Sequence, residues 1–572
     1  MTDLEKGKAA EAAATKARTS SVFHRHAPPP TGPKNLRCVM PQIVACVVAG
    51  LFNIPEGLAL AYSSSLIPHL MEGGDPDIHI TLDQGVLIAS VMVVAMCMGT
   101  FLTGLVMNRF GRLNTIRYSS VPFAVGWFLV AAASSYEEIL IGRVLTGIAN
   151  PLGVNSAVAF TTEVANPHIR GALNSAMTVL ASGGMVIMYV LGATLHWRTA
   201  AWVCGASPFI GVLLMYFFCY ESPIWLVSKG RHEEAGRSLR AYARANPTTE
   251  LREKLPEQQL EWLIQKKELA ASQAGGKQEP WYSTVLDLFR TPTGYKPLLL
   301  LTTVFLAQNF SGVYITLFYA TTFFQEMKVS FSAFDAAIFI GLTRLVIGML
   351  AIGLIRGVGI RKLMVGSSFG MAVCMVLSGY FTLYQEKSMG GYVPAGFVLL
   401  YVAFSCCGLL TVPWTMTAEL FPDRLRDVGQ SFTIFIADML MFAGLQLYPT
   451  LMNLLQYGHI TGTVGIQWFF AVVALANVVL VIFFLPETHG KSLSELEEHY
   501  EHNMLWLGRT KPDKLSDASV VVPTICTSVD AEGVTVLSTV LSAPDTTTPP
   551  AGLDARKASS DSIVSTGDSY RL

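Results

Sequence analysis

Twelve long apolar runs restrict what this chain can fold into more than any other feature. Each is about 20 residues or longer, the length that an α-helix needs to cross about 30 Å of hydrocarbon. Open strands cannot satisfy their backbone hydrogen bonds in lipid, so we interpret the runs as helices. The expected spans are residues 39–66, 84–107, 115–134, 138–162, 171–195, 200–220, 296–325, 331–355, 363–384, 393–418, 429–455 and 464–485. The sequence therefore predicts an all-α membrane protein with twelve transmembrane helices.

The composition agrees with a membrane protein and argues against several other classes. Hydrophobic residues make up 51% of the 572 residues and charged residues only 14%, against about 25% charged residues in soluble domains. The 40 basic residues balance the 41 acidic ones, so net charge gives no argument for nucleic acid. The Cys and His residues lack metal-ligand spacing, and no Walker loop occurs. We expect no metal, no cofactor, no nucleic acid and no enzymatic activity.

Basic residues predict which side of the membrane each loop faces. If the N-terminus is cytoplasmic, the outer loops carry only Arg198, Lys328 and Lys387. The inner loops then carry the basic segment 221–295 and these further cations: Arg109, Arg112, Arg170, Arg356, Arg361, Lys362, Arg424 and Arg426. Positive charge in short loops marks the cytoplasmic side. We therefore expect both termini in the cytoplasm, and we expect a plasma-membrane location.

Features of the inner loops recur in the two halves of the chain. In each half an acid precedes an arginine by seven residues, and a further acid follows the last apolar run. The matched pairs are Gly111 with Gly359, Glu163 with Glu419, Arg170 with Arg426, and Glu221 with Glu487. Because the pairs keep one order at a slowly growing offset, they indicate a duplicated six-helix unit.

The duplication and the shifts in composition divide the chain into five expected segments. A cytoplasmic tail, 1–38, precedes a first six-helix bundle, 39–220. Cytoplasmic linker helices, 221–295, lead into a second six-helix bundle, 296–486. The last segment, 487–572, is expected to be a cytoplasmic helix followed by a disordered tail rich in Ser, Thr and Pro.

Two bundles related by parallel duplication suit alternating access. A solute binds between them near the membrane midplane, and rocking of one bundle against the other exposes the site to each side in turn. The recurrent acids and arginines then act as latches that pair in one state and separate in the other. An exposed ion pair contributes only about 0–1 kcal/mol, so a latch needs several pairs. The alternative is that these charges only mark topology.

The chain resembles the sugar porter family of the major facilitator superfamily in five segments: "GRVLTGIANPLG", "EVANPHIRGAL", "YESPIWLVSKGRHEEA", "VPWTMTAELFPDRLRD" and "PETHGKSLSELEE". Their order and spacing match over roughly residues 40–500. Within the family, the chain is most similar to insect facilitated trehalose transporters and their vertebrate relatives in "LALAYSSSLIPHL" and "YSSVPFAVGWFLVAAA". The resemblance implies the major facilitator fold.

The resemblance also implies a cytoplasmic charge network that gates the solute pathway. The residues at the family's network positions are Arg112, Arg143, Glu163, Arg170, Glu221, Arg361, Glu419, Arg426 and Glu487. Three positions depart from the family pattern, because Asn108 replaces an acid while Leu113 and Ile360 each replace an arginine. We expect these departures to weaken two latches without abolishing them.

The sugar site implied by the resemblance is only partly kept. Family members grip sugar hydroxyls with amides, which both donate and accept hydrogen bonds. The helix-7 run reads "QNFSGVY", which keeps Gln308 but has Asn309 for a second Gln and Tyr314 for an Asn. Trp414 remains, and its flat face suits stacking on a sugar ring. The positions that match polar family residues on helices 5, 8 and 11 are Thr178, Arg344 and Asp438.

Two of these residues place charge inside spanning helices. Such a charge costs about 2.5–3.5 kcal/mol on insertion scales and usually faces a polar cavity or a partner. One hypothesis is that Arg344 and Asp438 face the central cavity, near enough to pair or to hold an ionic group of the solute. The alternative is a structural ion pair that locks helix 8 to helix 11.

Glu56 is a third ionisable residue within a span. Proton-coupled relatives carry an acid at the position of Ala59, which this chain lacks. Glu56 lies three residues earlier, on the same helical face, and Pro55 beside it frees a backbone carbonyl. Glu56 is therefore a candidate proton site. The alternatives are an acid that lines the outer cavity or a partner for a nearby basic residue.

These observations predict a transporter for a small polar solute. A sugar of the trehalose or hexose class leads because of the family resemblance, and facilitated diffusion leads over proton symport because of Ala59. The alternatives are a transporter of a charged organic solute, suggested by Arg344 and Asp438, and a sugar sensor that keeps the fold without transport. The expected partners are the solute and membrane lipid, and the sequence leaves the oligomeric state open.

Overall fold

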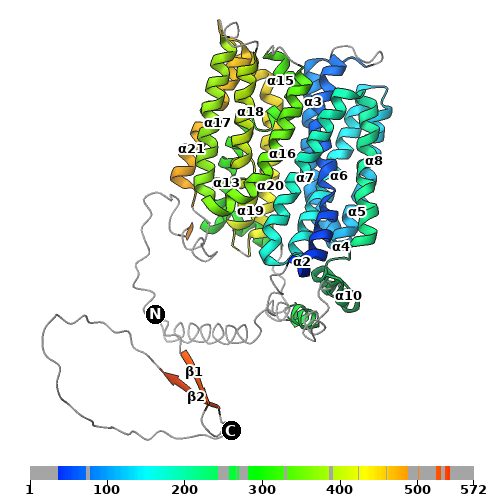
Figure 1. Ribbon diagram of the computed structural model, residues 1–572, viewed down its shortest axis with the longest axis vertical. Helices are drawn as coiled ribbons and strands as arrows, with labels where there is room; N and C mark the ends of the chain where they lie inside the picture. The colour runs from blue at the N-terminus through cyan, green and yellow to red at the C-terminus, as the bar shows by residue number, and fades with distance from the viewer. Residues whose placement is uncertain are drawn as a thin grey trace, which may run out of the picture. The chain divides into compact units, whose positions relative to one another are not determined.

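The computed structural model describes residues 36–71, 78–242, 257–265, 267–268, 281–327, 332–384, 391–422, 424–458, 460–486, 500–501, 524–529 and 535–540. They belong to two units, a helical unit within Met1–Arg509 and a strand unit within Thr510–Leu572. The helical unit contains both expected bundles and the described part of the linker between them (Figure 1).

The first bundle is built from six expected spans. Its helices are α2 (Leu36–Gly50), α3 (Asn53–Met71), α4 (Leu82–Phe110), α5 (Arg112–Ala132), α6 (Tyr136–Val164), α7 (Pro167–Thr194) and α8 (Trp197–Phe218). Helices α2 and α3 are the two parts of one span, which is interrupted at Leu51 and Phe52. Glu56 therefore lies in the first turn of a helix that begins inside the membrane.

The second bundle is interrupted more often. Its helices are α13 (Pro292–Phe310), α14 (Ile315–Phe318), α15 (Ala320–Glu326), α16 (Ala333–Val358), α17 (Ile360–Leu383), α18 (Tyr392–Cys407), α19 (Val412–Glu419), α20 (Arg426–Leu454) and α21 (Gly462–Phe484). The seventh span consists of α13 and α14 and is continued by α15, and the tenth consists of α18 and α19. Turns at residues 311–314 and 408–411 separate their parts.

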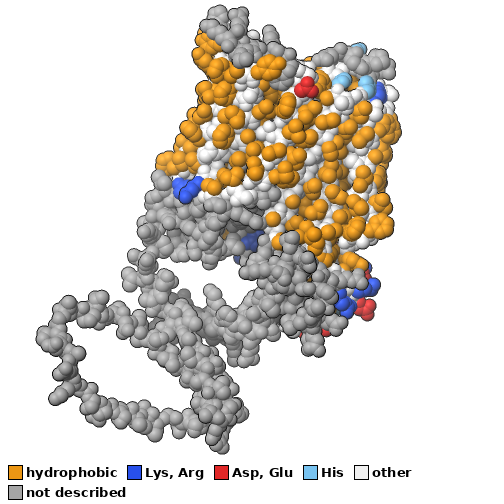
Figure 2. Space-filling view, viewed as in Figure 1, with side chains coloured by type: hydrophobic (Ala, Val, Ile, Leu, Met, Phe, Trp, Pro, Cys, Tyr) orange, Lys and Arg blue, Asp and Glu red, His pale blue; other side chains and the backbone are white. Residues whose placement is uncertain are grey.

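Length and composition agree with the expected membrane spans. Among the described residues, 10 helical segments are long and apolar enough to cross a membrane. The other two expected spans are α5 and α6, which have 21 and 29 residues and carry charges such as Arg117 and Arg143. Hydrophobic side chains cover most of the visible flank of the helices, whereas the coloured charged groups lie toward their ends (Figure 2). The predicted all-α membrane fold is confirmed.

The same pairs of helices pack in both bundles. Helix α5 packs on α6 and α8, as α17 packs on α18 and α21, and α3 packs on α7 as α13 packs on α20. Between the bundles, α7 packs on α16 and α20 packs on α4. These two contacts are equivalent under exchange of the two halves, which agrees with a duplicated unit. The line along which the bundles meet is called the seam below.

Small residues bring some of these helices close together. A Cβ atom added to Gly126 of α5 would lie 2.8 Å from the carbonyl oxygen of Gly142 in α6, and one added to Gly142 would lie 2.6 Å from the carbonyl oxygen of Gly126. Close packing of this kind replaces the hydrophobic effect, which does not drive helix association in lipid.

The labelled linker helices are α9 (Pro223–Ser228), α10 (His232–Tyr242) and α12 (Trp281–Arg290), and residues 257–265 are also helical. Helices α9 and α10 belong to the first bundle, because the Trp225 indole donates to the Asn108 carbonyl at 3.0 Å and the Tyr242 hydroxyl to the Tyr220 carbonyl at 2.6 Å. Helix α12 belongs to the second bundle, where Arg424 Nη2 lies 2.8 Å from Asp287 Oδ2. The end of the helical unit that carries α10 is called the linker end, and the opposite end the far end (Figure 1).

The strand unit differs from the expectation for the C-terminal tail. Strands β1 (Thr524–Val529) and β2 (Thr535–Val540) pair antiparallel, with Thr524 opposite Val540 and Val529 opposite Thr535. Both segments are rich in Thr and Val, which favour strands, although the rest of the tail has a composition typical of disorder.

Candidate solute site and gates

The interruptions of the seventh and tenth spans meet at Gln308. Its side-chain Nε2 donates to the carbonyl oxygens of Leu409 and Leu410, at 2.8 and 3.0 Å. A helix that stops leaves carbonyls without donors, so Gln308 satisfies the break between α18 and α19. Its nitrogen is therefore engaged by the protein, whereas its buried Oε1 has no hydrogen-bond partner among the described residues.

Asn309 has a similar arrangement. Its Nδ2 donates to the Phe305 carbonyl of its own helix at 2.8 Å, while its buried Oδ1 has no hydrogen-bond partner among the residues that the structure describes. Gly312, with φ of 90°, turns the chain immediately after these two amides. The start of the turn thus has two buried amide oxygens that can accept hydrogen bonds.

An aromatic group lies on the other broken span. The Trp414 indole donates to the Tyr314 hydroxyl at 3.2 Å, and its ring meets Phe305 edge-on with centroids 5.1 Å apart. Trp414 is half-buried, whereas Tyr314 and Phe305 are buried. The structure thus brings Gln308, Trp414 and Tyr314 together through the contacts of spans seven and ten.

Thr178 lies on the seam side of α7. It is eleven residues before Tyr189, which is about three helical turns and the same face. The Tyr189 hydroxyl reaches across the seam and donates to the Leu317 carbonyl at 3.0 Å. Thr178 itself is exposed. Along this face of α7, Thr178 is therefore exposed toward the linker end of the helix, whereas Tyr189 is buried.

The two charges within helices 8 and 11 are both buried but do not form an ion pair with each other. The charge of Arg344 acts on the hydroxyls of Tyr189, Tyr314 and Tyr401. Asp438 lies within electrostatic reach of the Cys97 thiol of α4, across the seam. The structural ion pair, which was the alternative hypothesis for these two residues, is therefore absent from this conformation.

Glu56 is half-buried and has no ion pair or side-chain hydrogen bond with another described residue. Tyr314 lies within electrostatic reach of Glu56, Arg344 and Asp438. Three of the charges within the spans therefore lie within electrostatic reach of one tyrosine of the seventh span. The expectation that Glu56 pairs with a nearby basic residue is not met among the described residues.

Arg143 requires a correction, because it does not lie in the cytoplasmic charge network. It is fully buried, and it donates to the Ala59 carbonyl at 3.0 Å and to Ser63 Oγ at 2.8 Å. It lies twenty residues before Glu163 in the same helix, which is about 30 Å of helix. The sequence indicates this position, because Arg143 is close to residue 138, the expected outer end of the span 138–162.

The first-bundle part of the charge network is assembled at the linker end. Arg112 pairs with Glu163 Oε1 through Nη2 at 2.6 Å and Nε at 2.9 Å. Ser222 Oγ donates to Glu163 Oε2. Glu221 accepts from the backbone N–H groups of Arg112 at 3.0 Å and Leu113 at 3.1 Å. These residues connect α5, α6 and the start of the linker within one bundle.

Other members of the predicted network lie elsewhere or outside the described residues. Arg170 Nη2 donates to the Ala165 carbonyl at 3.4 Å, and Arg361 donates to the Ile482 carbonyl. Arg426 is half-buried at the start of α20. Glu487 and the side chain of Glu419 lie outside the described residues, so their pairing stays a prediction.

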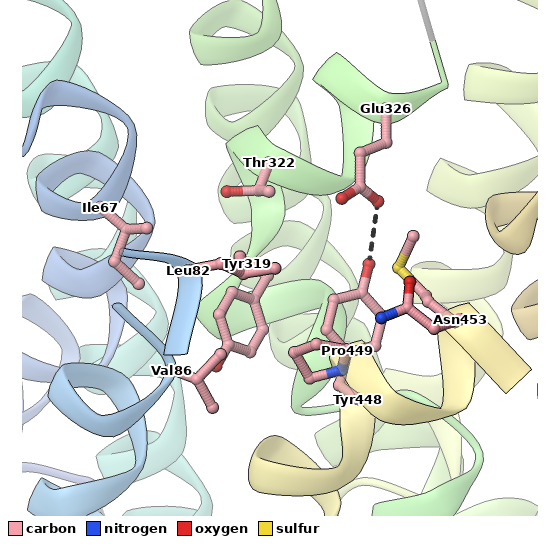
Figure 3. A pocket seen from close by; sticks show the side chains of 10 residues that line it. Ile67, Leu82, Val86, Tyr319, Thr322, Glu326, Tyr448, Pro449 and Asn453 are labelled. Atoms are coloured by element: carbon pink, nitrogen blue, oxygen red, sulfur yellow. Dashed lines mark hydrogen bonds between the residues drawn. The ribbon is translucent and has the colours of Figure 1, made fainter. Parts of the chain in front are cut away.

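Sequence reasoning missed a small pocket at the far end. It encloses about 90 Å³ between Ile67 and Val86 of the first bundle and residues of the second (Figure 3). The rings of Tyr319 and Tyr448 stack with centroids 5.2 Å apart, and the Tyr448 hydroxyl donates to Glu326 Oε2 at 3.4 Å. Glu326 lies just beyond the expected span, and burial raises its pKa to about 7.

Comparisons with known sequences agree with the family resemblance. The family model described as "Sugar (and other) transporter" matches residues 57–500. The chain is 27% identical over 462 residues to the facilitated trehalose transporter Tret1 of Aedes aegypti, covering 80% of this chain and 54% of that one. The match to Tret1 of Culex quinquefasciatus is 27% identical over 470 residues and covers 81% and 86%. The chain thus spans about half of the first relative and most of the second.

Solved structures show the same fold. The proton:xylose symporter XylE bound to 6-bromo-6-deoxy-D-glucose gives a TM-score of 0.64 at 21% identity, covering 81% of this chain and all of that one. The inward open conformation of XylE from E. coli gives 0.63 at 20% identity, covering 79% and 98%. At such identity the likeness concerns the arrangement of helices, which is that of the major facilitator superfamily.

Proposed function

We propose that this chain, which belongs to the sugar (and other) transporter family, moves a sugar of the trehalose or hexose class by facilitated diffusion with alternating access. The observation that carries the substrate class is the pair of unpartnered amide oxygens on Gln308 and Asn309, in the span whose Tyr314 and Phe305 contact the half-buried ring of Trp414. Hydroxyl groups donate to such oxygens, and an aromatic face suits a sugar ring. The Aedes and Culex relatives are facilitated trehalose transporters, which supports trehalose as the first candidate.

Facilitated diffusion is supported by the surroundings of Arg143. A proton-coupled transporter needs an acid whose protonation changes between states, and Ala59 replaces that acid in α3. Arg143 donates instead to the Ala59 carbonyl and to Ser63 Oγ. Neither acceptor titrates near neutral pH, so this contact offers no proton to transport.

The orientation and the gates follow from the same proposal. The linker end is cytoplasmic because it carries the basic loops, and the plasma membrane is the expected location. The network of Arg112, Glu163 and Glu221 gates that side. The exposure of Thr178 and the burial of Tyr189, which bonds across the seam, support an assignment of this conformation as open toward the linker end.

The test is uptake of labelled trehalose and glucose into vesicles that contain the purified protein, with counterflow. We expect exchange of one of these sugars, unchanged by a pH gradient, and a large loss in Trp414→Ala. Absence of exchange for both sugars, or uptake that follows the pH gradient, would contradict the proposal. The variant Glu56→Gln should likewise leave the pH response flat.

A transporter of an anionic organic solute is the second candidate. It is favoured by Arg344, whose buried guanidinium forms no ion pair with a described carboxylate. The same uptake panel includes labelled organic anions and the variant Arg344→Gln. If anions are carried by the wild type and lost in this variant, the sugar assignment is wrong.

A further inference from the structure

The far end of the seam is closed by hydrogen bonds that involve no charged group. Thr321 of α15 donates its hydroxyl to the carbonyl of Ser64 in α3. Tyr189 of α7 donates to the carbonyl of Leu317 in α14 at 3.0 Å. Each bond joins a side chain of one bundle to the backbone of the other. These residues belong neither to the expected solute site nor to the expected charge network.

The Ser64 carbonyl is available because of a proline. Within an α-helix the carbonyl of residue 64 accepts from the N–H of residue 68. Residue 68 is Pro68, which lies inside α3 and has no N–H to donate. The carbonyl would remain unsatisfied in a buried place, which is costly. Thr321, which is itself fully buried, supplies the missing donor from the other bundle.

The Leu317 carbonyl lies at a similar irregularity. Helix α14 ends at Phe318 and α15 begins at Ala320, with Tyr319 between them. Carbonyls near a helix end lack donors from their own helix. Tyr189 is 1% exposed, so its hydroxyl also requires a partner inside the protein. Each of the two bonds therefore pairs a buried hydroxyl of one bundle with a backbone carbonyl of the other bundle that lacks a donor from its own helix.

We propose that Thr321–Ser64 and Tyr189–Leu317 form a far-end clasp, and that Pro68 provides the clasp with one of its two acceptors. The inference rests on alternating access from the proposed function. Opening the far end requires both bonds to break, whereas the charges of Arg112, Glu163 and Glu221 at the linker end stay within one bundle. The two gates thus use different chemistry, with neutral hydrogen bonds at the far end and ions at the linker end.

Opening is measurable without any solute. Val86 lines the far-end pocket and is 2% exposed, so a cysteine introduced as Val86→Cys reacts with a membrane-impermeant maleimide only when the bundles part there. The full-length protein in vesicles is labelled from the far side, and the rate is corrected for the wild type. Because this readout needs no transport, its outcome is separate from that of the sugar-uptake experiment.

Three substitutions test the clasp in the Val86→Cys background. Thr321→Val removes one donor, Tyr189→Phe removes the other, and Pro68→Ala restores an N–H that competes with Thr321. A hydrogen bond that contributes about 0.5–1.5 kcal/mol corresponds to a roughly 2- to 10-fold change in labelling rate. We expect an acceleration in that range for each variant and a larger one for Thr321→Val with Tyr189→Phe.

Matched controls separate the clasp from general loosening. Thr322→Val removes a neighbouring hydroxyl that lines the pocket, and Tyr62→Phe removes a hydroxyl that donates to Trp197 at 3.1 Å within the first bundle. Neither control should accelerate labelling, and Thr321→Ser, which keeps a hydroxyl, should restore the slow rate. The clasp is refuted if Thr321→Val and Tyr189→Phe label at the wild-type rate, or if the controls accelerate labelling equally.

Discussion

At the scale of single residues, a polar side chain of the seam can hydrogen-bond either to the solute or to another part of the protein. Gln308 was expected to hold solute, yet its nitrogen holds the carbonyls of Leu409 and Leu410. Only its oxygen is left for a ligand. A family motif identifies such a residue from the sequence but cannot tell which of its atoms the protein itself uses, because that depends on where a second, distant span is broken.

Gln308→Met should therefore destabilise the protein even without solute. The change keeps the volume but leaves two buried carbonyls without donors, each worth about 1–3 kcal/mol. Thermal unfolding in detergent should show a clear loss of stability. Asn309→Leu is the control, because Asn309 donates only within its own helix, and its loss should stay below about 1 kcal/mol. Equal losses in both variants would show that the bridge to α18 contributes nothing.

At the scale of helices, the sequence predicted the spans better than their interruptions. Apolar length suffices to locate a span, whereas the turns at 311–314 and 408–411 depend on tertiary contacts such as that of Gln308. Rotation about the helix axis was also beyond the sequence. Arg344 and Asp438 occupy their expected helices, but they form no ion pair with each other in this conformation.

The junction of α4 and α5 depends on the backbone conformation of Gly111 and on the carboxylate of Glu221. Gly111 has φ of 98°, which side chains rarely tolerate, and a Cβ atom there would lie 2.6 Å from Glu221 Oε2. Gly111→Ala should cost about 1–3 kcal/mol of stability and displace Glu221 from the N–H groups of α5. Gly104→Ala, in open space on α4, is the control for thermal unfolding. Equal stability of the two variants would contradict this reading of the junction.

At the scale of the whole molecule, the two ends of the seam respond to different conditions. Residues of both bundles surround the far-end pocket, in which Glu326 accepts from Tyr448 (Figure 3). Among the described residues, Tyr448 is the titratable side chain that interacts with the Glu326 carboxyl group. The acid is half-buried while the pocket is closed, and opening would return it to solvent. Its protonation and the closure of the far end are therefore coupled.

We predict that acid on the far side favours the closed pocket. The pKa of Glu326 is raised from 4.5 to about 7 when the pocket is closed, so protonated Glu326 stabilises the closed pocket. This stabilisation is fully present below about pH 4.5 and is lost as the pH rises through 7. Labelling of Val86→Cys should rise several-fold from pH 5 to pH 8, relative to the same cysteine in Glu326→Gln, which corrects for thiol reactivity. Parallel profiles in the two backgrounds would exclude Glu326 as the sensor.

The division of the linker between the two bundles has a consequence for how the chain can be assembled. Helices α9 and α10 stay with the first bundle through Trp225 and Tyr242, and α12 stays with the second through Asp287. Two polypeptides separated within residues 269–280 would each retain these anchoring bonds, and the first would also keep the packing of Leu260 and Ile264 on α9. We expect the two fragments, when co-expressed, to assemble in the membrane.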